Sequence, residues 1–345
     1  MVSWKNIVLE AKKEAQNYYS QHGIAPTLRG LFYILVSKNV IPNTINYYRT
    51  LSSVLAKERY VGNFPWYLIR DETRTFRWGE VGYSIVDAEK VVDELKNMKP
   101  EDKERILKEY LKNKYRVKIN KWEGQKYSVL VIVEKEAQYD AVEKVVNSDL
   151  KWSVATTTSR GFESATALNH LVSWIEHVKK QERVPVLLFI FDWDPSGEYA
   201  SIYDFIFRLC LLMYRDDREE IMDRWSKSKI DEKEQIIKDL VKDVGIVFEK
   251  VMLTWEQVKK YNLPPEPQDQ ETKRKLERDP RARMFLEKYG FLGQVEVDAM
   301  FALYYDEAKK IVDEAIKRYF DFNKYQEVVK KEEELKKKVF DLLGG

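Results

Sequence analysis

The most constraining feature of the sequence is an apolar run that ends in two aspartates separated by one residue. The run extends from Val186 to Phe191 and leads directly into Asp192, Trp193 and Asp194. An uninterrupted apolar run of this length is typical of a strand buried on both faces, as in the parallel sheet of an α/β protein. Alternate side chains of an extended chain point the same way, so both aspartates should project from the carboxyl end of that strand.

The two aspartates favour a cation site. Two carboxylates held close together repel each other, and protonation of one or a shared hard cation relieves that repulsion. Mg²⁺ commonly binds one or two carboxylates plus water, and Mn²⁺ substitutes on the same ligands. Two other interpretations fit the motif alone. The acids could simply cap a strand before a surface turn, or the first aspartate could be the nucleophile of a haloacid-dehalogenase-type phosphatase.

The region around this motif alternates between strand and helix patterns. The segment "YSVLVIVEKEAQYDAVEKVV" predicts a buried strand ending at Glu134 and then a helix, and "KWSVATTTSRG" predicts a second strand before a loop. With the helix of "FESATALNHLVSWIEHV" and the Asp-x-Asp strand, this series predicts a parallel, doubly wound sheet. All its strand ends emerge at one edge. Glu134, the loop containing Arg160 and Gly161, Asp192 and Asp194 should therefore converge.

The segments that flank this region have helical patterns. Thr75 to Lys121 is charged and predicts a solvated helical connector. After the Asp-x-Asp strand come charged helices, one further strand in "GIVFEKVML", a Pro-rich loop and two long amphipathic helices. The final "KKEEELKKK" tail is expected to be a solvated helix face.

The N-terminal part of the chain predicts three helices followed by a wing. The three apolar stripes are Trp4, Ile7, Val8, Ala11 and Ala15; Leu28, Leu31, Phe32 and Leu35; and Tyr47, Leu51, Val54 and Leu55. The segment "NFPWYLIRDETR" then has strand-like content around Trp66, Leu68 and Ile69. Three helices plus a wing are a common DNA-binding layout, and a helical cap domain without DNA contact is the alternative.

Composition excludes several classes of protein. Lys and Arg total 59 against 57 Asp and Glu, a net charge of +2, so DNA binding would have to come from local basic patches. Cys210 is the only cysteine, which excludes a disulfide framework and a thiolate zinc site. His170 and His177 are expected on a solvated helix face. No signal peptide or membrane-spanning run is evident, so we expect a cytoplasmic protein with no membrane partner.

The order of the acidic motifs resembles the Toprim domain, which topoisomerases, primases and some nucleases share. That domain has a Glu after one strand, a Gly-bearing loop after the next and Asp-x-Asp after the third, as at Glu134, Gly161 and Asp192. The same order disfavours the phosphatase interpretation, because that fold normally opens with its Asp-x-Asp strand.

More of the chain resembles one Toprim branch, the A subunit of DNA topoisomerase VI and the related meiotic double-strand-break transesterase. It is most similar to the stand-alone prokaryotic and plasmid or phage relatives of that subunit. "LRGLFY" resembles the stretch that carries the catalytic tyrosine, with Arg29 and Tyr33 in register, and "VEVDAM" resembles a later segment with Glu296 and Asp298. The family's acid after the arginine is Gly30 here, which leaves the role of Tyr33 open.

The resemblance implies an organisation for the whole chain. It places a winged-helix domain with the candidate tyrosine at 1–75, a helical connector at 76–122, a Toprim domain with helical insertions at 123–320 and a C-terminal helix at 321–345. The expected partners are double-stranded DNA, a second copy in a homodimer, and a separate ATPase subunit if the protein passes strands. The third helix offers Arg49, Lys57 and Arg59, and the sheet domain offers Arg160, for nucleic-acid contacts.

Three functions follow from the resemblance. The first is a Mg²⁺-dependent DNA-cleaving enzyme in which Tyr33 attacks a phosphodiester, Arg29 assists the phenolate, and Glu134, Asp192 and Asp194 hold the metal. In the first function Glu134 could alternatively transfer a proton. The second is a Toprim nuclease that uses water and forms no covalent link. The third is a non-catalytic DNA-binding partner.

Overall fold

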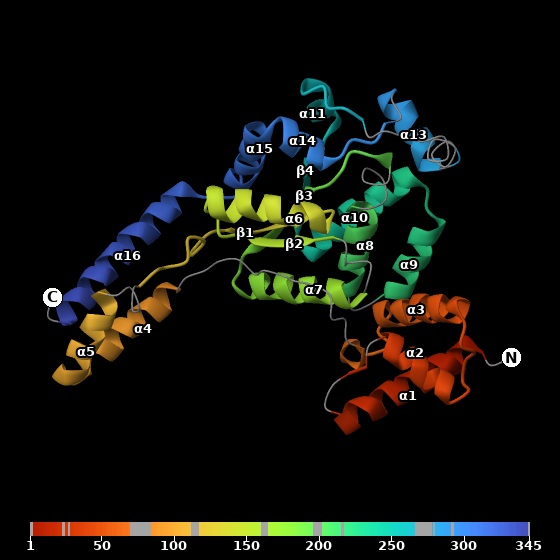
Figure 1. Cartoon of the computed structure of the whole chain (residues 1–345), viewed down its shortest axis with the longest axis horizontal. Coiled ribbons are helices and arrows are strands. Elements are labelled where there is room, and N and C mark those ends of the chain that lie inside the picture. Colours follow the sequence, from red (N-terminus) through yellow and green to blue (C-terminus); the bar gives the residue numbers. More distant parts are fainter. Residues whose placement is uncertain are drawn as a thin grey trace.

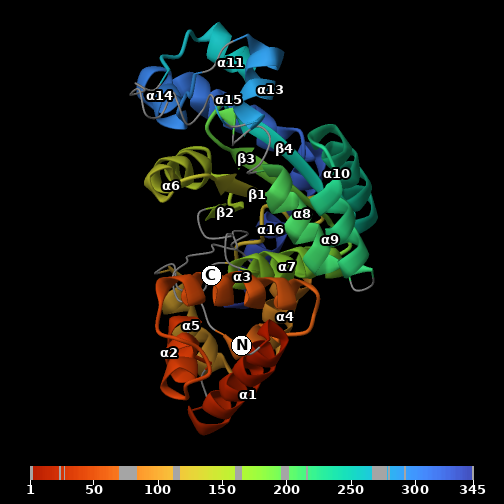
Figure 2. The same cartoon turned by 90° about the vertical axis from the view of Figure 1, so that its right-hand side faces the viewer.

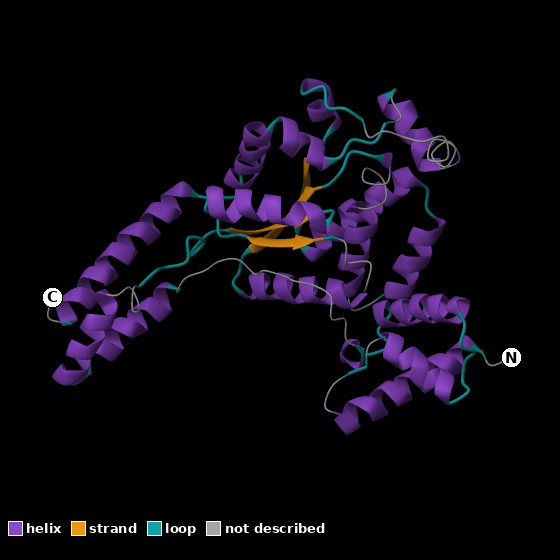
Figure 3. Cartoon of the chain, viewed as in Figure 1, coloured by secondary structure: helices purple, strands orange, loops and turns teal. Residues whose placement is uncertain are grey.

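A parallel four-stranded sheet forms the centre of the molecule (Figures 1 and 3). Its strands are β1 (Tyr127–Val133), β2 (Ala155–Thr158), β3 (Val184–Ile190) and β4 (Val247–Met252), in the order β2-β1-β3-β4. Val133 at the end of β1 pairs with Thr158 and with Ile190, so three strand ends align at one edge. The predicted parallel α/β sheet is confirmed.

The computed structural model describes residues 3–22, 25–26, 28–69, 84–111, 117–159, 165–195, 202–214, 217–265, 278, 280–290 and 293–343. Helices cover both faces of the sheet, because successive residues of β1 and β3 point to opposite sides. One face packs against α7 (Ala165–Lys180), α8 (Ile202–Met213) and α10 (Ile230–Val244). The short helix α9 (Arg218–Lys227) connects α8 to α10 along the chain.

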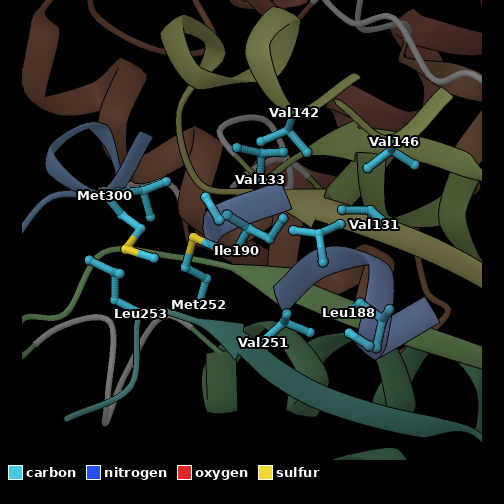
Figure 4. Packing of buried hydrophobic residues seen from close by; sticks show 14 of the residues in the cluster. Val131, Val133, Val142, Val146, Leu188, Ile190, Val251, Met252, Leu253 and Met300 are labelled. Carbon is cyan, nitrogen blue, oxygen red and sulfur yellow. The ribbon is translucent and has the colours of Figure 1, made fainter. Parts of the chain in front are cut away.

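The other face of the sheet carries the helices that position the acidic residues. They are α6 (Glu136–Glu143), its π-helical extension η2 (Lys144–Asp149), α11 (Trp255–Lys260), α13 (Pro280–Tyr289), α14 (Val297–Leu303) and α15 (Tyr305–Lys317). Figure 4 shows this packing, in which Val133 and Ile190 of the sheet lie among Val142, Met252 and Met300. The ends of β1 and β3 are therefore packed within an apolar core.

The N-terminal helices α1 (Trp4–His22), α2 (Leu28–Ser37) and α3 (Ile45–Tyr60) pack around the three predicted apolar stripes. Tyr60 at the end of α3 also belongs to the core around α7 and α8, and Arg218 Nη1 donates to its carbonyl at 2.9 Å. Figures 1 and 2 accordingly place α3 between α2 and α7. The first part of the chain is thus docked onto the sheet domain through α3.

The predicted strand at the start of the wing is wrong. Trp66–Leu68 form a 3-10 helix, η1, after Pro65. Leu68 and Ile69 are buried in the N-terminal core. The Arg59 guanidinium donates hydrogen bonds to the carbonyls of Trp66 and Ile69, which would pair with a neighbouring strand if this segment were a β-strand. The rest of the predicted wing, from residue 70, lies outside the described residues.

The charged connector and the C-terminal tail form one helical unit instead of two solvated segments. The connector splits into α4 (Ile85–Lys96) and α5 (Pro100–Leu111), and both lie beside α16 (Phe322–Leu342) in Figure 1. Leu335 of the "KKEEELKKK" tail is buried against them, and Lys331 pairs with Glu89 at 2.6 Å. One face of the tail helix is therefore packed, which the prediction from its charge pattern missed.

Candidate functional site at the carboxyl edge of the sheet

Glu134 and Asp192 meet where β1 and β3 end. The backbone N–H of Glu134 donates to the carbonyl of Ile190 at 3.2 Å, which continues the parallel pairing by one residue. The Glu134 carboxylate in turn accepts the backbone N–H of Asp192, with Oε2 and N 2.8 Å apart. The strand alignment thus brings together two acids that lie 58 positions apart.

Asp192 is the buried centre of the site, with 4% of its surface exposed. Its Oδ2 lies 2.7 Å from the ammonium of Lys135, and its Oδ1 accepts the backbone N–H of Val297 at 2.8 Å. The amide of Gln138 also donates to Oδ1, at 3.3 Å. A buried carboxylate needs such partners, because desolvation penalises an unpaired charge.

Two further acids join the site from α14, as the "VEVDAM" segment suggested. Glu296, which precedes α14, accepts from Lys135 Nζ at 2.6 Å. Asp298 in the first turn accepts from Gln138 at 2.7 Å. We call Glu134, Asp192, Asp194, Glu296 and Asp298 the acidic cluster.

The residue between the two aspartates is held rigidly. Trp193 forms an antiparallel bridge with Val295, with both N–H to carbonyl distances at 2.9 Å. Its fully buried indole stacks on Trp255 at 4.8 Å and contacts Phe285 at 4.3 Å. The bridge brings the segment before α14 to the sheet edge, which is why Glu296 can reach Lys135.

The electrostatics of the cluster disfavour a second negative charge near Asp192. Burial raises the pKa of Glu134 to about 7, and the charges of Asp192 and Asp194 add to this effect. Burial acts to lower the pKa of Lys135, but its hydrogen bonds to Asp192 and Glu296 prevail and raise that pKa above its ordinary value. Lys135 therefore stays charged, while Glu134 exchanges its proton near neutral pH.

The raised pKa of Glu134 makes stability depend on pH. Below about pH 4.5 the Glu134 carboxyl is protonated in both the folded and the unfolded protein. Between pH 4.5 and about pH 7 only the folded protein holds this proton. The free energy of unfolding therefore falls as the pH rises through this window. We expect Glu134→Gln to raise the free energy of unfolding at pH 8 by about 1 to 3 kcal/mol, with the gain vanishing near pH 4, below the unfolded pKa. Urea unfolding at both pH values measures this, and an equal gain at both would contradict it.

The donor set of the cluster suits a hard divalent cation. All its acids offer carboxylate oxygens, the ligands that Mg²⁺ and Mn²⁺ favour. Within the described residues, however, no three or more His, Cys, Asp or Glu side chains are arranged to hold a metal ion. The reason is visible in the contacts, because the Lys135 ammonium and the Gln138 amide lie between the carboxylates. The ammonium supplies positive charge between Asp192 and Glu296.

The candidate nucleophile lies in a different part of the molecule. Tyr33 on α2 is 55% exposed and its ring contacts Phe32, which confirms that it is outside the core. Figures 1 and 2 place α3 between α2 and the sheet domain. Arg29 and Gly30 occupy the first turn of α2, and the placement of the Arg29 side chain lies outside the described part of the chain.

The predicted nucleic-acid contacts divide into exposed and buried residues. Arg49 and Lys57 are exposed on α3, two helical turns apart on the face that also carries Ser53. Arg59 is 6% exposed, and its guanidinium donates to the carbonyls of Trp66 and Ile69 at 3.2 and 2.9 Å. Its prediction as a DNA contact is therefore wrong. Arg160 and Gly161 lie outside the described residues.

Arg59 should matter for stability instead. We expect Arg59→Met to lower the free energy of unfolding by about 2 to 3 kcal/mol, because two carbonyls of the η1 turn lose their donor. Arg49→Met on the exposed face of the same helix should change it by no more than about 0.5 kcal/mol. Urea unfolding of the two variants tests this difference, and equal stability losses would refute the structural role of Arg59.

Sequence reasoning missed three residues of the site. Lys135 and Gln138 begin the helix after β1, and Lys250 on β4 donates to the backbone carbonyl of Asp192 at 3.0 Å. The position of Lys135 directly after Glu134 was the available signal. The position of Lys135 at the start of α6 does not indicate that its side chain pairs with Asp192, which follows β3.

A cavity of about 710 Å³ lies at the opposite edge of the sheet. Lys126 and Arg183, which line it with Trp174 and His177, precede β1 and β3, whereas the acidic cluster follows them. The cavity is therefore separate from the chemistry described above.

Comparisons with known proteins add no identification. No protein-family model matches the chain, and no curated protein matches it. Among the helices that the structure describes, none combines the length and apolar character needed to cross a bilayer.

Proposed function

We propose that this protein is a divalent-metal-dependent enzyme that cleaves double-stranded DNA, with the acidic cluster as its reaction centre. The observation that carries the proposal is the meeting of Glu134, Asp192 and Glu296 at the carboxyl edge of a parallel sheet. Open α/β sheets bind ligands at this edge. Carboxylates would repel a phosphate on their own, so their concentration there favours chemistry assisted by a cation.

The chain's own residues have distinct roles in this proposal. Glu134, Asp192 and Asp194 would hold Mg²⁺, with Glu296 and Asp298 beside them. When bound, the metal neutralises charge on the phosphate that is attacked. Glu134 has a pKa of about 7 and can release or take up a proton at its second carboxyl oxygen, Oε1, because Oε2 accepts the Asp192 N–H.

Tyr33 is proposed as the nucleophile. Its phenolate oxygen would form a bond to phosphorus, the bond to the 3′ oxygen would break, and that oxygen would leave with a proton. The product would be a 5′-phosphotyrosyl link. The resemblance to the topoisomerase VI A subunit implies that this tyrosine attacks a strand held by the acidic cluster of a second copy, so the proposed working form is a homodimer.

The exposed face of α3 is proposed to hold the DNA backbone. Arg49 and Lys57 provide positive charge there, and Thr50 and Ser53 provide hydroxyl groups. Contacts of this kind position DNA without reading its sequence. The logarithm of the DNA affinity should fall linearly with the logarithm of the salt concentration, with a slope set by the number of phosphates contacted. That number should be small here.

A hydrolytic nuclease is the second candidate. Two observations favour it: Glu134 has a pKa suited to a general base for water, and α2, which carries Tyr33, lies on the far side of α3 from the sheet domain. A purely structural DNA-binding role would not require a buried Asp192 with three partners at the sheet edge. Strand passage would additionally need an ATPase subunit.

Incubation with supercoiled plasmid tests the proposal directly. Mg²⁺ or Mn²⁺ should produce nicked or linear DNA, and EDTA should abolish this activity. Denaturation with detergent before electrophoresis should leave protein attached to 5′ ends if the tyrosine acts. Complete absence of cleavage with both metals and with DNA bound would refute the enzyme proposal.

A further inference from the structure

The ammonium of Lys135 lies between two carboxylates of the acidic cluster, those of Asp192 and Glu296. Its Nζ lies 2.7 Å from Oδ2 of Asp192 and 2.6 Å from Oε1 of Glu296. Its side chain is 27% exposed, whereas that of Asp192 is 5% exposed. The lysine therefore reaches from a partly open position to a buried carboxylate.

The surrounding charges explain why a cation sits there. Asp192 is buried, Glu296 lies on the other side of the ammonium, and the Glu134 carboxylate contacts the backbone of Asp192. Without Lys135, the partners that the described residues offer the Asp192 carboxylate would be neutral donors, namely the Val297 N–H and the Gln138 amide. A positive charge at this place offsets part of the cost of burying the Asp192 carboxylate.

A divalent cation would compete for the same oxygens. Mg²⁺ binds carboxylate oxygens at about 2.0 to 2.1 Å, closer than an ammonium can approach, and carries twice the charge. The Lys135 ammonium and a metal ion cannot both lie between Asp192 and Glu296, because the two cations repel each other at such distances.

We infer that Lys135 is an internal counter-ion that closes the metal-free site and must leave Asp192 when a divalent cation binds. The inference rests on the proposed function, because it specifies how the metal site of that enzyme is regulated. The cost of displacing the lysine lowers metal affinity, so the site fills only when enough Mg²⁺ is present. In the metal-free protein the same contact stabilises the sheet edge.

Lys135→Met tests this role through metal binding instead of cleavage. The Mn²⁺ affinity of the full chain, measured by electron paramagnetic resonance of free Mn²⁺, should rise by about tenfold or more, because the competing charge is gone. The melting temperature of the metal-free variant should fall, and saturating Mn²⁺ should restore more of it than in the wild type. Lys135→Gln, which keeps a donor for Asp192 but no charge, should show the same gain in affinity if the methionine variant does not fold.

Lys331→Met is the matched control. It removes the same charge from a lysine of similar exposure, whose ammonium lies 2.6 Å from Glu89 between α16 and α4 and makes no contact with the acidic cluster. Its Mn²⁺ affinity should change by less than about threefold. Asp192→Asn should remove the binding in every background, which assigns the signal to this site.

The outcomes separate the two proposals. Unchanged or weaker Mn²⁺ binding by both Lys135 variants, with normal binding by the wild type, would overturn the counter-ion role and leave the proposed enzyme intact. Binding by the Lys135 variants alone would support the role strongly. Absence of Mn²⁺ binding in the wild type and in both Lys135 variants would overturn the metal site and this inference together.

Discussion

Replacement of Asp192 by asparagine is expected to reduce metal-dependent DNA cleavage by roughly 10³-fold or more. Asp192 is the buried acid to which Lys135, Gln138 and Val297 all donate. The amide cannot balance a cation, so the transition-state charge on the phosphate would lose its main support. Initial rates of plasmid cleavage at saturating Mg²⁺ measure this loss.

The same substitution should also weaken the fold. Lys135 loses its buried partner, and because the lysine is partly exposed we expect a decrease of about 1 to 3 kcal/mol in the free energy of unfolding. Glu249→Gln on β4 is the control, since that acid pairs with Arg318 away from the cluster. It should leave cleavage within about twofold of the wild type. Asp192→Asn cleavage near the wild-type rate, in a folded protein, would remove the acidic cluster from the mechanism.

Tyr33→Phe is expected to abolish cleavage while folding and Mn²⁺ binding stay intact. The substitution removes one hydroxyl from a side chain that is 55% exposed, so the N-terminal core should not change. Loss of the attacking oxygen removes the covalent step, and no protein should remain attached to 5′ DNA ends after denaturation. Gel assays of cleavage and of protein-linked DNA measure both effects.

Tyr67→Phe provides the matched control, because Tyr67 is also exposed in the N-terminal helical group. It should cleave at the wild-type rate. If Tyr33→Phe cleaves as fast as Tyr67→Phe, the nucleophile is not this phenol. Water activated near Glu134 would then be the remaining nucleophile, and the protein would be a hydrolytic nuclease.

The sequence alone determined the sheet and two of its acids. The short, Val- and Ile-rich apolar runs before Asp192 and before Glu134 predict strands buried on both faces, and both are strands in the structure. Parallel pairing then places both strand ends at one edge, so the meeting of Glu134 and Asp192 follows from local patterns. The apolar stripes of α1, α2 and α3 were readable for the same reason, since a helical period directly reports the buried face.

Only the tertiary structure decided which charged residues are partners and which are solvated. Lys135 pairs with Asp192 and with Glu296, and all three residues lie far apart in the chain. The Glu296 contact forms because the bridge between Trp193 and Val295 brings the start of α14 to the sheet edge. Arg59 is buried by a local turn. The charged tail similarly packs through Leu335 against α4 and α5. Hydrophobic periodicity is encoded within one element, whereas the partner of a charge depends on which distant element the fold places beside it.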